Sequence, residues 1–290
     1  MSEPTRRAHV TGWGRYAPAG VLTNAGGATF NNVGGLHTAG GGTTNNQAGA
    51  TLNNLSGGLV TVRGTLNNAG SLTNQSGGTV QNYVTLNNSG YLSNFGALNN
   101  SGGMSNAFIA KNYGSVNNAN TLTNNSRFFN SAGGTLDNQG VLTNNLYFFN
   151  HGTLNNNGTL TNSYGWHWIW NYGTLNNTGT LSNDGFIQDF GTVNNSGAIN
   201  NARSIGFATL SNSSGGVINN SYSMVVGTSL NNSAGATLSN SGSLSNYGVV
   251  TNAGTLTNQA GATLTNVGDA TLNNTGVLRN AGTADIRAHS

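Results

Sequence analysis

The sequence repeats a short unit of about six residues, in which one aliphatic residue stands between polar ones and Asn closes the unit. Gly173-Thr174-Leu175-Asn176-Asn177 and Gly179-Thr180-Leu181-Ser182-Asn183 are two such units, and related units run from about Val21 to about Asn280. Side chains alternate along a strand, so each unit places its aliphatic residue on one side and its neighbours on the other. A single unit cannot bury its own leucine, so the units must stack on one another. The pattern predicts a solenoid, and the alternative is a disordered chain.

The spacing of the units indicates how many strands form one coil. Two sets of units recur in the middle of the chain, the first near Ser115, Thr135, Thr153, Thr174, Thr192 and Thr209 and the second near Thr121, Val141, Thr159, Thr180 and Ala198. A third set carries large apolar residues at Phe108, Phe128, Phe148, Trp168, Ile187, Ile205 and Met224. Each set recurs about every 18–21 residues. Three strands of about six residues per coil predict an all-β fold, a three-sided parallel β-helix.

Composition decides between this solenoid and disorder. Only 5% of the residues are charged and 45 of 290 are Gly, which would suit a low-complexity disordered chain. Both prolines, Pro4 and Pro18, precede the first repeat, and the aliphatic residue returns in register. Since proline would interrupt a strand ladder, its absence from the repeats favours order. We expect an N-terminal cap or leader at residues 1–20, a parallel β-helix at 21–282 and a C-terminal tail at 283–290.

The Asn that closes most units has an expected structural role. Asn138, Asn156, Asn177 and Asn195 would lie at equal positions in successive coils. Stacked Asn side chains can hydrogen-bond to one another and to backbone groups at the corners. Asn also tolerates the left-handed conformation that a corner can require. We therefore predict ladders of Asn side chains that hold the coils together.

Several other classes of protein or site are disfavoured by the sequence. The chain has no Cys, and no apolar run is long enough to span a bilayer, so neither disulfides nor membrane insertion are expected. The net charge of +3 comes from scattered residues such as Arg63, Lys111 and Arg279, which form no basic stripe for nucleic acid. The histidines are spread along the chain, so we predict no metal site and no cofactor.

The units Thr153-Leu154-Asn155-Asn156-Asn157 and Gly158-Thr159-Leu160-Thr161-Asn162 resemble the passenger repeats of bacterial filamentous-haemagglutinin-like and autotransporter adhesins. The resemblance covers about nine tenths of the chain. It implies a right-handed parallel β-helix at a cell surface. Met1–Gly20 contains no apolar segment of signal-peptide length, so the chain as written would stay in the cytoplasm, and the localisation stays open.

A second resemblance is local. The run Ala8-His9-Val10-Thr11-Gly12-Trp13-Gly14-Arg15-Tyr16-Ala17-Pro18, with Val21-Leu22-Thr23-Asn24 after it, is similar to the start of β-ketoacyl-acyl-carrier-protein synthase III enzymes. That family needs a Cys nucleophile, which this chain lacks, so the activity does not carry over. Trp13, Tyr16 and Pro18 would instead cap the first coil and protect its strand edges.

The third set of units is where we expect a binding surface. Strand alternation sends about half of its large side chains inward, and the others must face solvent. An exposed stripe of aromatic side chains would stack on sugar rings or dock on another chain. The alternative is a locally thicker core. The predicted aromatic binding face consists of Phe128, Phe148, Trp166, Trp168, Trp170, Tyr172 and Phe190.

Two other functions are compatible with parts of the sequence. Hydrolysis of a glycosidic bond needs two nearby carboxyl groups, for which Asp184 and Asp189 are the best candidates, with His167 and Arg203 about one coil away. Because Asn183-Asp184-Gly185 predicts a turn, we expect no catalytic residues and no enzyme. The Thr-x-Thr pairs at Thr121, Thr159, Thr255 and Thr263 resemble ice-binding faces of antifreeze solenoids, although Thr is also a common residue of exposed strands.

The sequence therefore predicts a non-catalytic structural or adhesive solenoid. Its expected partners are a carbohydrate or protein surface bound by the aromatic face, or further copies of the chain assembled into fibres. Ice binding is the first alternative, and a polysaccharide-active enzyme is the second.

Overall fold

The computed structural model describes residues 15–17 and 20–285, and every regular element in them is a β-strand. The described part of the chain therefore holds no helix of the length and apolar character that a membrane span requires. The expected N-terminal cap, including Trp13 and Pro18, lies outside the described residues apart from β1 (Arg15–Ala17). The chain divides into two units, residues 1–142 and residues 143–290, which are described separately below.

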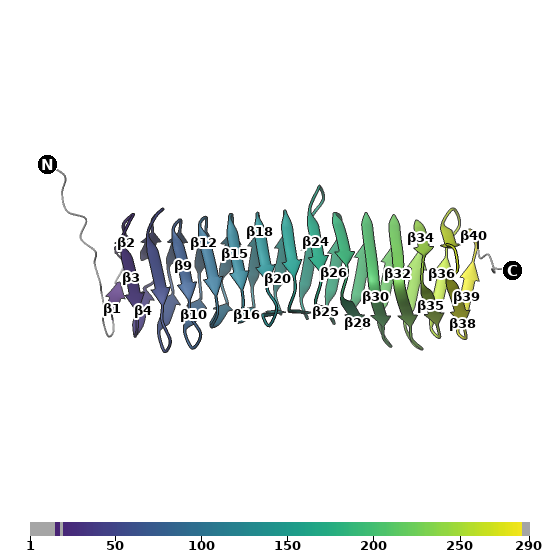
Figure 1. Ribbon diagram of the computed structural model, residues 1–290, viewed down its shortest axis with the longest axis horizontal. Coiled ribbons are helices and arrows are strands. Elements are labelled where there is room, and N and C mark those ends of the chain that lie inside the picture. Colours follow the sequence, from purple (N-terminus) through teal and green to yellow (C-terminus); the bar gives the residue numbers. More distant parts are fainter. Residues whose placement is uncertain (1–14, 18–19, 286–290) are drawn as a thin grey trace. The chain divides into compact units, whose positions relative to one another are not determined.

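Within each unit the strands form a parallel β-solenoid with three strands per coil (Figure 1). Most strands pair in parallel with the strand three places before them and the strand three places after them, as β7 does with β4 and β10. Around the long strands β30 and β32 several partners are two places apart, as are β29 and β31. This pairing sorts the strands of a unit into three columns, which correspond to the three predicted sets of units. At three strands per coil, the forty described strands make about thirteen coils. The predicted parallel solenoid is thus confirmed, and its right-handed sense stays a prediction.

The columns of the first unit are as follows. The first column contains β1 (Arg15–Ala17), β4 (Gly35–Thr38), β7 (Leu59–Val62), β10 (Thr79–Asn82), β13 (Ala97–Asn100), β16 (Ser115–Asn118) and β19 (Thr135–Asn138). The second column contains β2 (Val21–Asn24), β5 (Thr43–Asn46), β8 (Thr65–Asn68), β11 (Thr85–Asn88), β14 (Gly103–Asn106) and β17 (Thr121–Asn124). The third column contains β3 (Thr29–Asn32), β6 (Thr51–Asn54), β9 (Ser71–Asn74), β12 (Tyr91–Asn94), β15 (Ile109–Asn112) and β18 (Arg127–Asn130).

The second unit repeats this arrangement, and β20 (Val141–Asn144) contains the boundary between the units. Its first column contains β22 (Thr153–Asn156), β25 (Thr174–Asn177), β28 (Thr192–Asn195), β35 (Val249–Asn252) and β38 (Thr271–Asn274). Its second column contains β23 (Thr159–Asn162), β26 (Thr180–Asn183), β29 (Ala198–Asn201), β31 (Val217–Asn220), β33 (Thr237–Asn240), β36 (Thr255–Asn258) and β39 (Val277–Asn280). Its third column contains β21 (Tyr147–Asn150), β24 (Trp168–Asn171), β27 (Phe186–Asp189), β34 (Ser243–Asn246), β37 (Thr263–Asn266) and β40 (Thr283–Asp285). The long strands β30 (Ser204–Asn212) and β32 (Ser223–Asn232) each span a corner and serve both the third and the first column.

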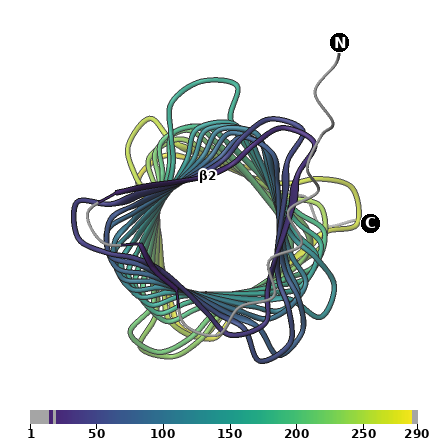
Figure 2. The same cartoon turned by 90° about the vertical axis from the view of Figure 1, so that its left-hand side faces the viewer.

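Most strands have four residues, of which the second and fourth point inward and the first and third point outward. In β25, for example, Leu175 and Asn177 are buried, whereas Thr174 and Asn176 are partly exposed. The second position supplies an aliphatic or aromatic core that runs through each unit. Figure 2 looks along the stack and shows the coils of the first unit surrounding this common interior. A period of two with a single aliphatic residue per strand is therefore enough to fill the core.

The fourth position carries the predicted Asn ladders. Asn156 Nδ2 donates to Asn177 Oδ1 over 2.7 Å and to the carbonyl of Thr180 over 2.9 Å. Asn177 repeats both contacts, with Asn195 Oδ1 and with the carbonyl of Ala198. Similar bonds follow the other two corners, at Asn162 in the second column and Asn150 in the third, so these buried amides link one coil to the next strand of the neighbouring coil. Buried polar groups need such partners, and the ladders supply them.

Glycine is required at many corners because successive coils come very close there. A Cβ added at Gly173 or at Gly191 would lie 2.1 Å from the carbonyl oxygen of the residue at the same corner in the preceding coil. In the part of the chain that the structure describes, a left-handed backbone occurs at glycines of longer corners, such as Gly133 and Gly215. No described residue other than Gly has a positive φ, so the closing Asn does not use the left-handed conformation that it tolerates. The ladder instead needs the Asn at the end of a regular strand.

The length of a coil follows from its corners. The shortest regular coils separate ladder partners by 18 residues, as between Asn177 and Asn195. A longer corner with a left-handed glycine adds two residues, which gives spacings of 20 and 22, as for Asn212–Asn232 and Asn24–Asn46. Residues 163–167 form a longer corner that raises the spacing to 21. The four-residue strands keep their register because the insertions lie outside them, and the register shift between β30 and β32 lies at the corner between Phe207 and Thr209.

Candidate functional site

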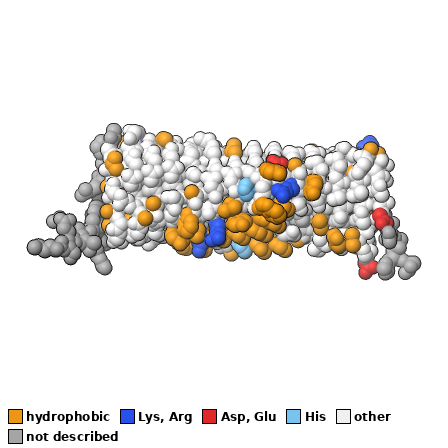
Figure 3. Space-filling view, turned by 90° about the horizontal axis from the view of Figure 1, so that it is seen from above, with side chains coloured by type: hydrophobic (Ala, Val, Ile, Leu, Met, Phe, Trp, Pro, Cys, Tyr) orange, Lys and Arg blue, Asp and Glu red, His pale blue; other side chains and the backbone are white. Residues whose placement is uncertain are grey.

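Large aromatic side chains gather at the outward positions of three successive strands in the second unit. Tyr147 and Phe149 lie on β21, Trp168 and Trp170 on β24, and Phe186 on β27, and all five are half-buried. Figure 3 shows a face on which hydrophobic side chains gather with Lys or Arg and His side chains among them, while most of the other side chains in view are neither hydrophobic nor charged. These five rings form the strand part of what we call the aromatic patch.

The rings of the strand part stack on one another. Phe149 and Trp170 have ring centroids 4.7 Å apart and planes 11° apart, and Trp168 and Phe186 have centroids 4.6 Å apart and planes 15° apart. Trp168 and Trp170, two residues apart on β24, stack at 5.1 Å. Neighbouring strands are about 4.8 Å apart, so rings at equal positions come into contact with no change in the backbone. The rings therefore use much of their faces on one another.

A second group of rings occupies the corner that follows the third column. His151 and Tyr172 stack with centroids 4.6 Å apart, and Tyr172 and Phe190 stack at 5.0 Å. Each of the three residues directly follows a ladder position and directly precedes Gly, as in Asn171-Tyr172-Gly173. Tyr172 and Phe190 are exposed. This corner stack borders the strand part and belongs to the aromatic patch.

The third part of the patch is the loop of residues 163–167, which carries Tyr164 and Trp166. These rings are the most exposed aromatics in the described residues, at 82% and 72%. The guanidinium of Arg203 holds the loop: its Nη1 donates to the carbonyl of Gly165 over 2.7 Å. Its carbon lies 4.4 Å from the ring centroid of Phe186 and within 5.6 Å of those of Tyr164 and Trp166. Cation–π attraction of this kind fixes the loop against β27.

The structure brings five of the seven predicted site residues together, namely Trp166, Trp168, Trp170, Tyr172 and Phe190. The other two, Phe128 and Phe148, are only 1% and 0% exposed. They hold the inward second position of β18 and β21, so the expectation that they line an exposed face is wrong. Whether the five clustered residues bind a partner stays a prediction.

The sequence analysis did not identify Tyr147, Phe149 and Phe186 as part of the patch, nor the contacts by which Arg203 holds the loop of residues 163–167. It aligned the third column on its largest residues, which placed Phe108 and Trp168 in one line with the buried Phe128. The buried line in fact contains Ala110 and Ile169 at those coils. The closing Asn was the available signal: counting back from it assigns the second position inward and the third outward in most of the four-residue strands that end in Asn.

The first unit has smaller aromatic groups of its own. Phe95 and Tyr113 stack at a corner with centroids 4.7 Å apart, and Tyr91 meets Phe108 edge to face at 5.1 Å. Lys111 Nζ lies 5.9 Å from the ring centroid of Phe129. The same corner and strand positions are thus used in both units.

The two candidate catalytic acids occupy different environments. Asp184 is exposed at a corner, whereas Asp189 is buried at a ladder position. Asp189 accepts hydrogen bonds from Asn171 Nδ2 and from the backbone N–H groups of three other residues, Gly191, Ala208 and Thr209. Burial raises the pKa of Asp189, and these hydrogen bonds lower it in part. The carboxylate of Asp189 is therefore occupied by hydrogen bonds inside the corner, and it does not face the surface together with Asp184.

Two further sequence expectations concern threonine arrays and metals. The Thr-x-Thr pairs that begin at Thr121, Thr159 and Thr255 lie on the second column, but the pair at Thr263 lies on the third. The pairs therefore do not form one array. Among the residues with described positions, no group of three or more His, Cys, Asp or Glu side chains is placed to hold a metal ion.

No protein-family model matches the chain, and no curated protein matches its sequence. The solved structures include a crystal structure of a fragment of TibA, hyper-glycosylated by TibC, with a TM-score of 0.40 and 20% sequence identity to this chain. That match covers 93% of this chain and 95% of the TibA fragment chain.

Proposed function

We propose that the protein is a non-catalytic structural solenoid that attaches to a carbohydrate or protein surface through the aromatic patch of its second unit. The observation that carries this proposal is the concentration of rings at outward positions. Elsewhere these positions hold mainly Thr, Ser and Asn, which are sufficient for a solvated strand face. Rings that are not needed for the core expose apolar area, and contiguous apolar area on a protein surface is characteristic of binding sites.

The stacking gives the patch a defined chemistry. Because the ring faces contact one another, the strand part presents mainly ring edges to solvent, while the corner ring of Phe190 and the loop ring of Trp166 remain largely exposed. Ring edges carry partial positive charge, and exposed faces carry partial negative charge. The surface thus offers a rigid apolar platform whose exposed rings can stack on the C–H face of a sugar or on an apolar side chain.

The patch is also organised before any partner arrives. Each strand ring is held by a neighbouring ring, and the loop is held by Arg203. Ordering of loose side chains costs about 0.5–1.5 kcal/mol for each side chain on binding, and this cost is largely avoided here. We infer that Asp189 has a structural role, since its two oxygens already accept four N–H groups. This assignment supports attachment rather than hydrolysis.

The test removes exposed rings that contribute little to the fold. Tyr172→Ala and Trp166→Ala should each weaken attachment to an immobilised polysaccharide or glycoprotein panel by about tenfold, because exposed aromatic anchors often account for 1 kcal/mol or more of binding. Tyr247→Ala is the matched control: Asn246-Tyr247-Gly248 has the same corner sequence as Asn171-Tyr172-Gly173, and Tyr247 is also exposed.

The proposal fails if Tyr247→Ala weakens attachment as much as Tyr172→Ala, or if neither change has an effect. Enzymatic removal of the glycans from the glycoprotein panel separates a carbohydrate partner from a protein partner. Sedimentation velocity on the same variants identifies self-association, which would shift the role of the patch from attachment to fibre assembly.

A further inference from the structure

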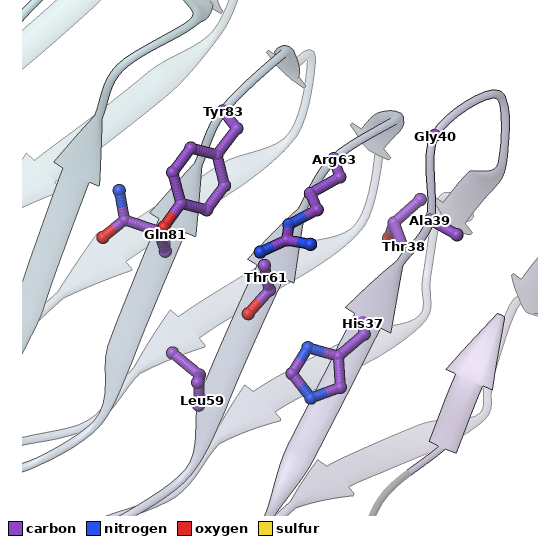
Figure 4. Close-up of a pocket in the computed structure, with 9 residues that line it drawn as sticks. All are labelled: His37, Thr38, Ala39, Gly40, Leu59, Thr61, Arg63, Gln81 and Tyr83. Carbon is purple, nitrogen blue, oxygen red and sulfur yellow. The ribbon is translucent and has the colours of Figure 1, made fainter.

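A groove of about 520 Å³ lies on the first column of the first unit (Figure 4). Its floor consists of the outward third positions of three neighbouring strands: His37 on β4, Thr61 on β7 and Gln81 on β10. Arg63 and Tyr83, at the corner that follows these strands, form one wall, and other lining residues include Leu59, Thr38, Ala39 and Gly40. Figure 4 shows the guanidinium of Arg63 extended over Thr61, between the side chains of His37 and Gln81.

The charge of Arg63 is available to a ligand. None of the acidic side chains that the structure describes forms an ion pair with Arg63. The described acid of the first unit, Asp137, is three strand steps beyond Gln81 in register, which is about 14 Å along the column. The ring of Tyr83 lies 5.5 Å from the guanidinium carbon and holds it in place from one side. The guanidinium of Arg63 is therefore held in position by the ring of Tyr83, and its charge is not neutralised by a described acidic side chain.

The other lining groups are neutral hydrogen-bonding groups. The Tyr83 hydroxyl can donate and accept, and the Gln81 amide offers both functions, whereas Thr61 is only 7% exposed. Gly35 leaves room for the ring of His37, since a Cβ added at this glycine would lie 2.6 Å from His37 Nε2. Leu59, an exposed apolar side chain, contributes the apolar part of the lining. One cation thus lies among several neutral polar groups and one apolar contact.

We propose that this groove binds an acidic saccharide, with Arg63 bound to its carboxylate or sulfate group and Gln81 and Tyr83 to its hydroxyls. Guanidinium groups bind planar carboxylates through two parallel hydrogen bonds. A ligand that also uses the neutral donors and acceptors must carry several hydroxyls, and Leu59 suits the C–H face of a pyranose ring. The three floor residues are spaced by about 4.8 Å along an open groove, which suits a chain of sugar units.

Other anionic ligands fit the groove less well. A nucleic acid strand needs repeated cations along its phosphates, but the next cation of the repeats in this unit, Lys111, lies on the third column. A small inorganic anion would use Arg63 alone and leave the neutral groups unused. An acidic peptide would be expected to bury an apolar anchor, for which Leu59 offers contact but no enclosed pocket.

Isothermal titration of the full-length chain tests the proposal with four probes: a galacturonate trimer, a neutral galactose trimer, a sulfated heparin oligosaccharide and inorganic sulfate. We expect saturable binding of the galacturonate trimer or the heparin oligosaccharide. Whichever of the two depends on Arg63 identifies the acidic group as carboxylate or sulfate. Arg63→Gln should weaken that binding by about 10- to 100-fold, because hydrogen bonds to a charged group are lost.

The matched control is Lys111→Gln. It removes the same charge from the same unit, also from a cation beside an aromatic ring, and should change affinity by less than about twofold because Lys111 lies outside the groove. Tyr83→Phe keeps the ring beneath Arg63 and removes only the hydroxyl, so it should weaken binding by about two- to tenfold. Both Arg63 and Tyr83 are exposed, so we expect the Arg63→Gln and Tyr83→Phe variants to fold like the wild type.

Four results would overturn the proposal: no saturable binding of either acidic probe, equal binding of the neutral trimer, equal binding of inorganic sulfate alone, or equal losses for Arg63→Gln and Lys111→Gln. Variants of Tyr172 and Trp166 should leave this binding unchanged, so the outcome is independent of the function proposed for the aromatic patch.

Discussion

Asp189 occupies a position at which the preceding coil has Asn171, and the difference matches a change in the next coil. There the ladder position holds the buried Phe207, which can neither donate nor accept, and the corner is shortened so that β30 continues through it. The backbone N–H groups of Ala208 and Thr209 point at Asp189 Oδ2 instead. An acceptor-only side chain is required where the neighbouring coil offers only donors.

This environment predicts a pH dependence of stability with a definite sign. Burial raises the pKa of Asp189 above its unfolded-state value of about 3.9, so the folded chain binds this proton more tightly than the unfolded chain. The resulting stabilisation is complete below the unfolded-state pKa and is lost as pH rises through the raised folded-state pKa. Urea unfolding of the wild type should therefore show a stability that falls with rising pH across this window.

Asp189→Asn should abolish that slope. At neutral pH this substitution should also lower the free energy of unfolding by about 1–2 kcal/mol. Both carboxylate oxygens of Asp189 accept N–H groups, so the NH2 group of Asn would face an N–H donor whichever way its side-chain amide is turned. Asp184→Asn, at an exposed corner, serves as the control and should keep the slope. An unchanged slope in Asp189→Asn would show that Asp189 does not titrate in this window.

A second residue-scale prediction concerns the start of a ladder. Asn82 Oδ1 is buried and has no hydrogen-bond partner, because the preceding coil has the apolar Val62 at the ladder position. Val62→Asn would place an Nδ2 donor at the spacing that other ladder pairs use. It should raise the free energy of unfolding by about 1 kcal/mol in urea titrations. Val60→Asn, at the inward core position of the same strand, should instead be destabilising, and a similar loss for Val62→Asn would contradict the prediction.

At the scale of the strand, the four-residue pattern could be predicted from the sequence but the orientation of the aromatic strands could not. Phe128 and Phe129 are chemically alike and adjacent, so hydrophobicity alone does not say which of them points inward. In β24 the most apolar residues occupy both sides, with Trp168 and Trp170 outward and Ile169 inward. The closing Asn resolves both cases, because its amide must face the ladder.

The loop of residues 163–167 lies outside the core strands, so we expect that it can be shortened without loss of the fold. Deletion of Tyr164, Gly165 and Trp166 joins Ser163 to His167 and restores the two-residue corner and the 18-residue spacing found elsewhere. The variant should keep its far-ultraviolet circular dichroism and unfold close to the wild-type midpoint, because corner length does not affect the core strands. Its attachment should fall as far as that of Trp166→Ala.

Deletion of Ile169 alone is the control for this experiment. It removes a fully buried side chain and shifts the rest of β24 by one residue, so side chains would exchange faces. We expect a loss of several kcal/mol, in line with large-to-small core changes. If the loop deletion were equally damaging, the loop would be part of the fold and not an insertion used for binding.

For a whole unit, the period and the parallel stacking could be predicted because each coil needs the next to bury its leucines. The expected period of about 18–21 residues came from the middle of the chain and missed the spacing of 22 in the first coils. Two-residue corner insertions cause it, as at Gly27 and Gly41, and they leave the strand pattern unchanged. The groove at Arg63 could not be predicted, because its residues come from three coils and only their register brings them together.

If stability is built from contacts between neighbouring coils, one whole coil should be removable from a unit. Gly96 and Gly114 hold the same corner position in successive coils, since a Cβ at Gly114 would lie 2.2 Å from the Gly96 carbonyl oxygen. Deletion of residues 97–114 joins Gly96 to Ser115 and brings β10, β11 and β12 beside β16, β17 and β18 with all ladders in register.

This variant should have the same circular dichroism per residue as the wild type and a urea midpoint close to it, because only one repeated interface is lost. Deletion of residues 97–115 removes one residue more and provides the control. It takes the first residue from β16, so either a corner shortens or Val116 turns outward. That variant should unfold at a clearly lower urea concentration. Equal midpoints for the two deletions would mean that register does not control stability, and a collapse of both would mean that the unit folds only as a whole.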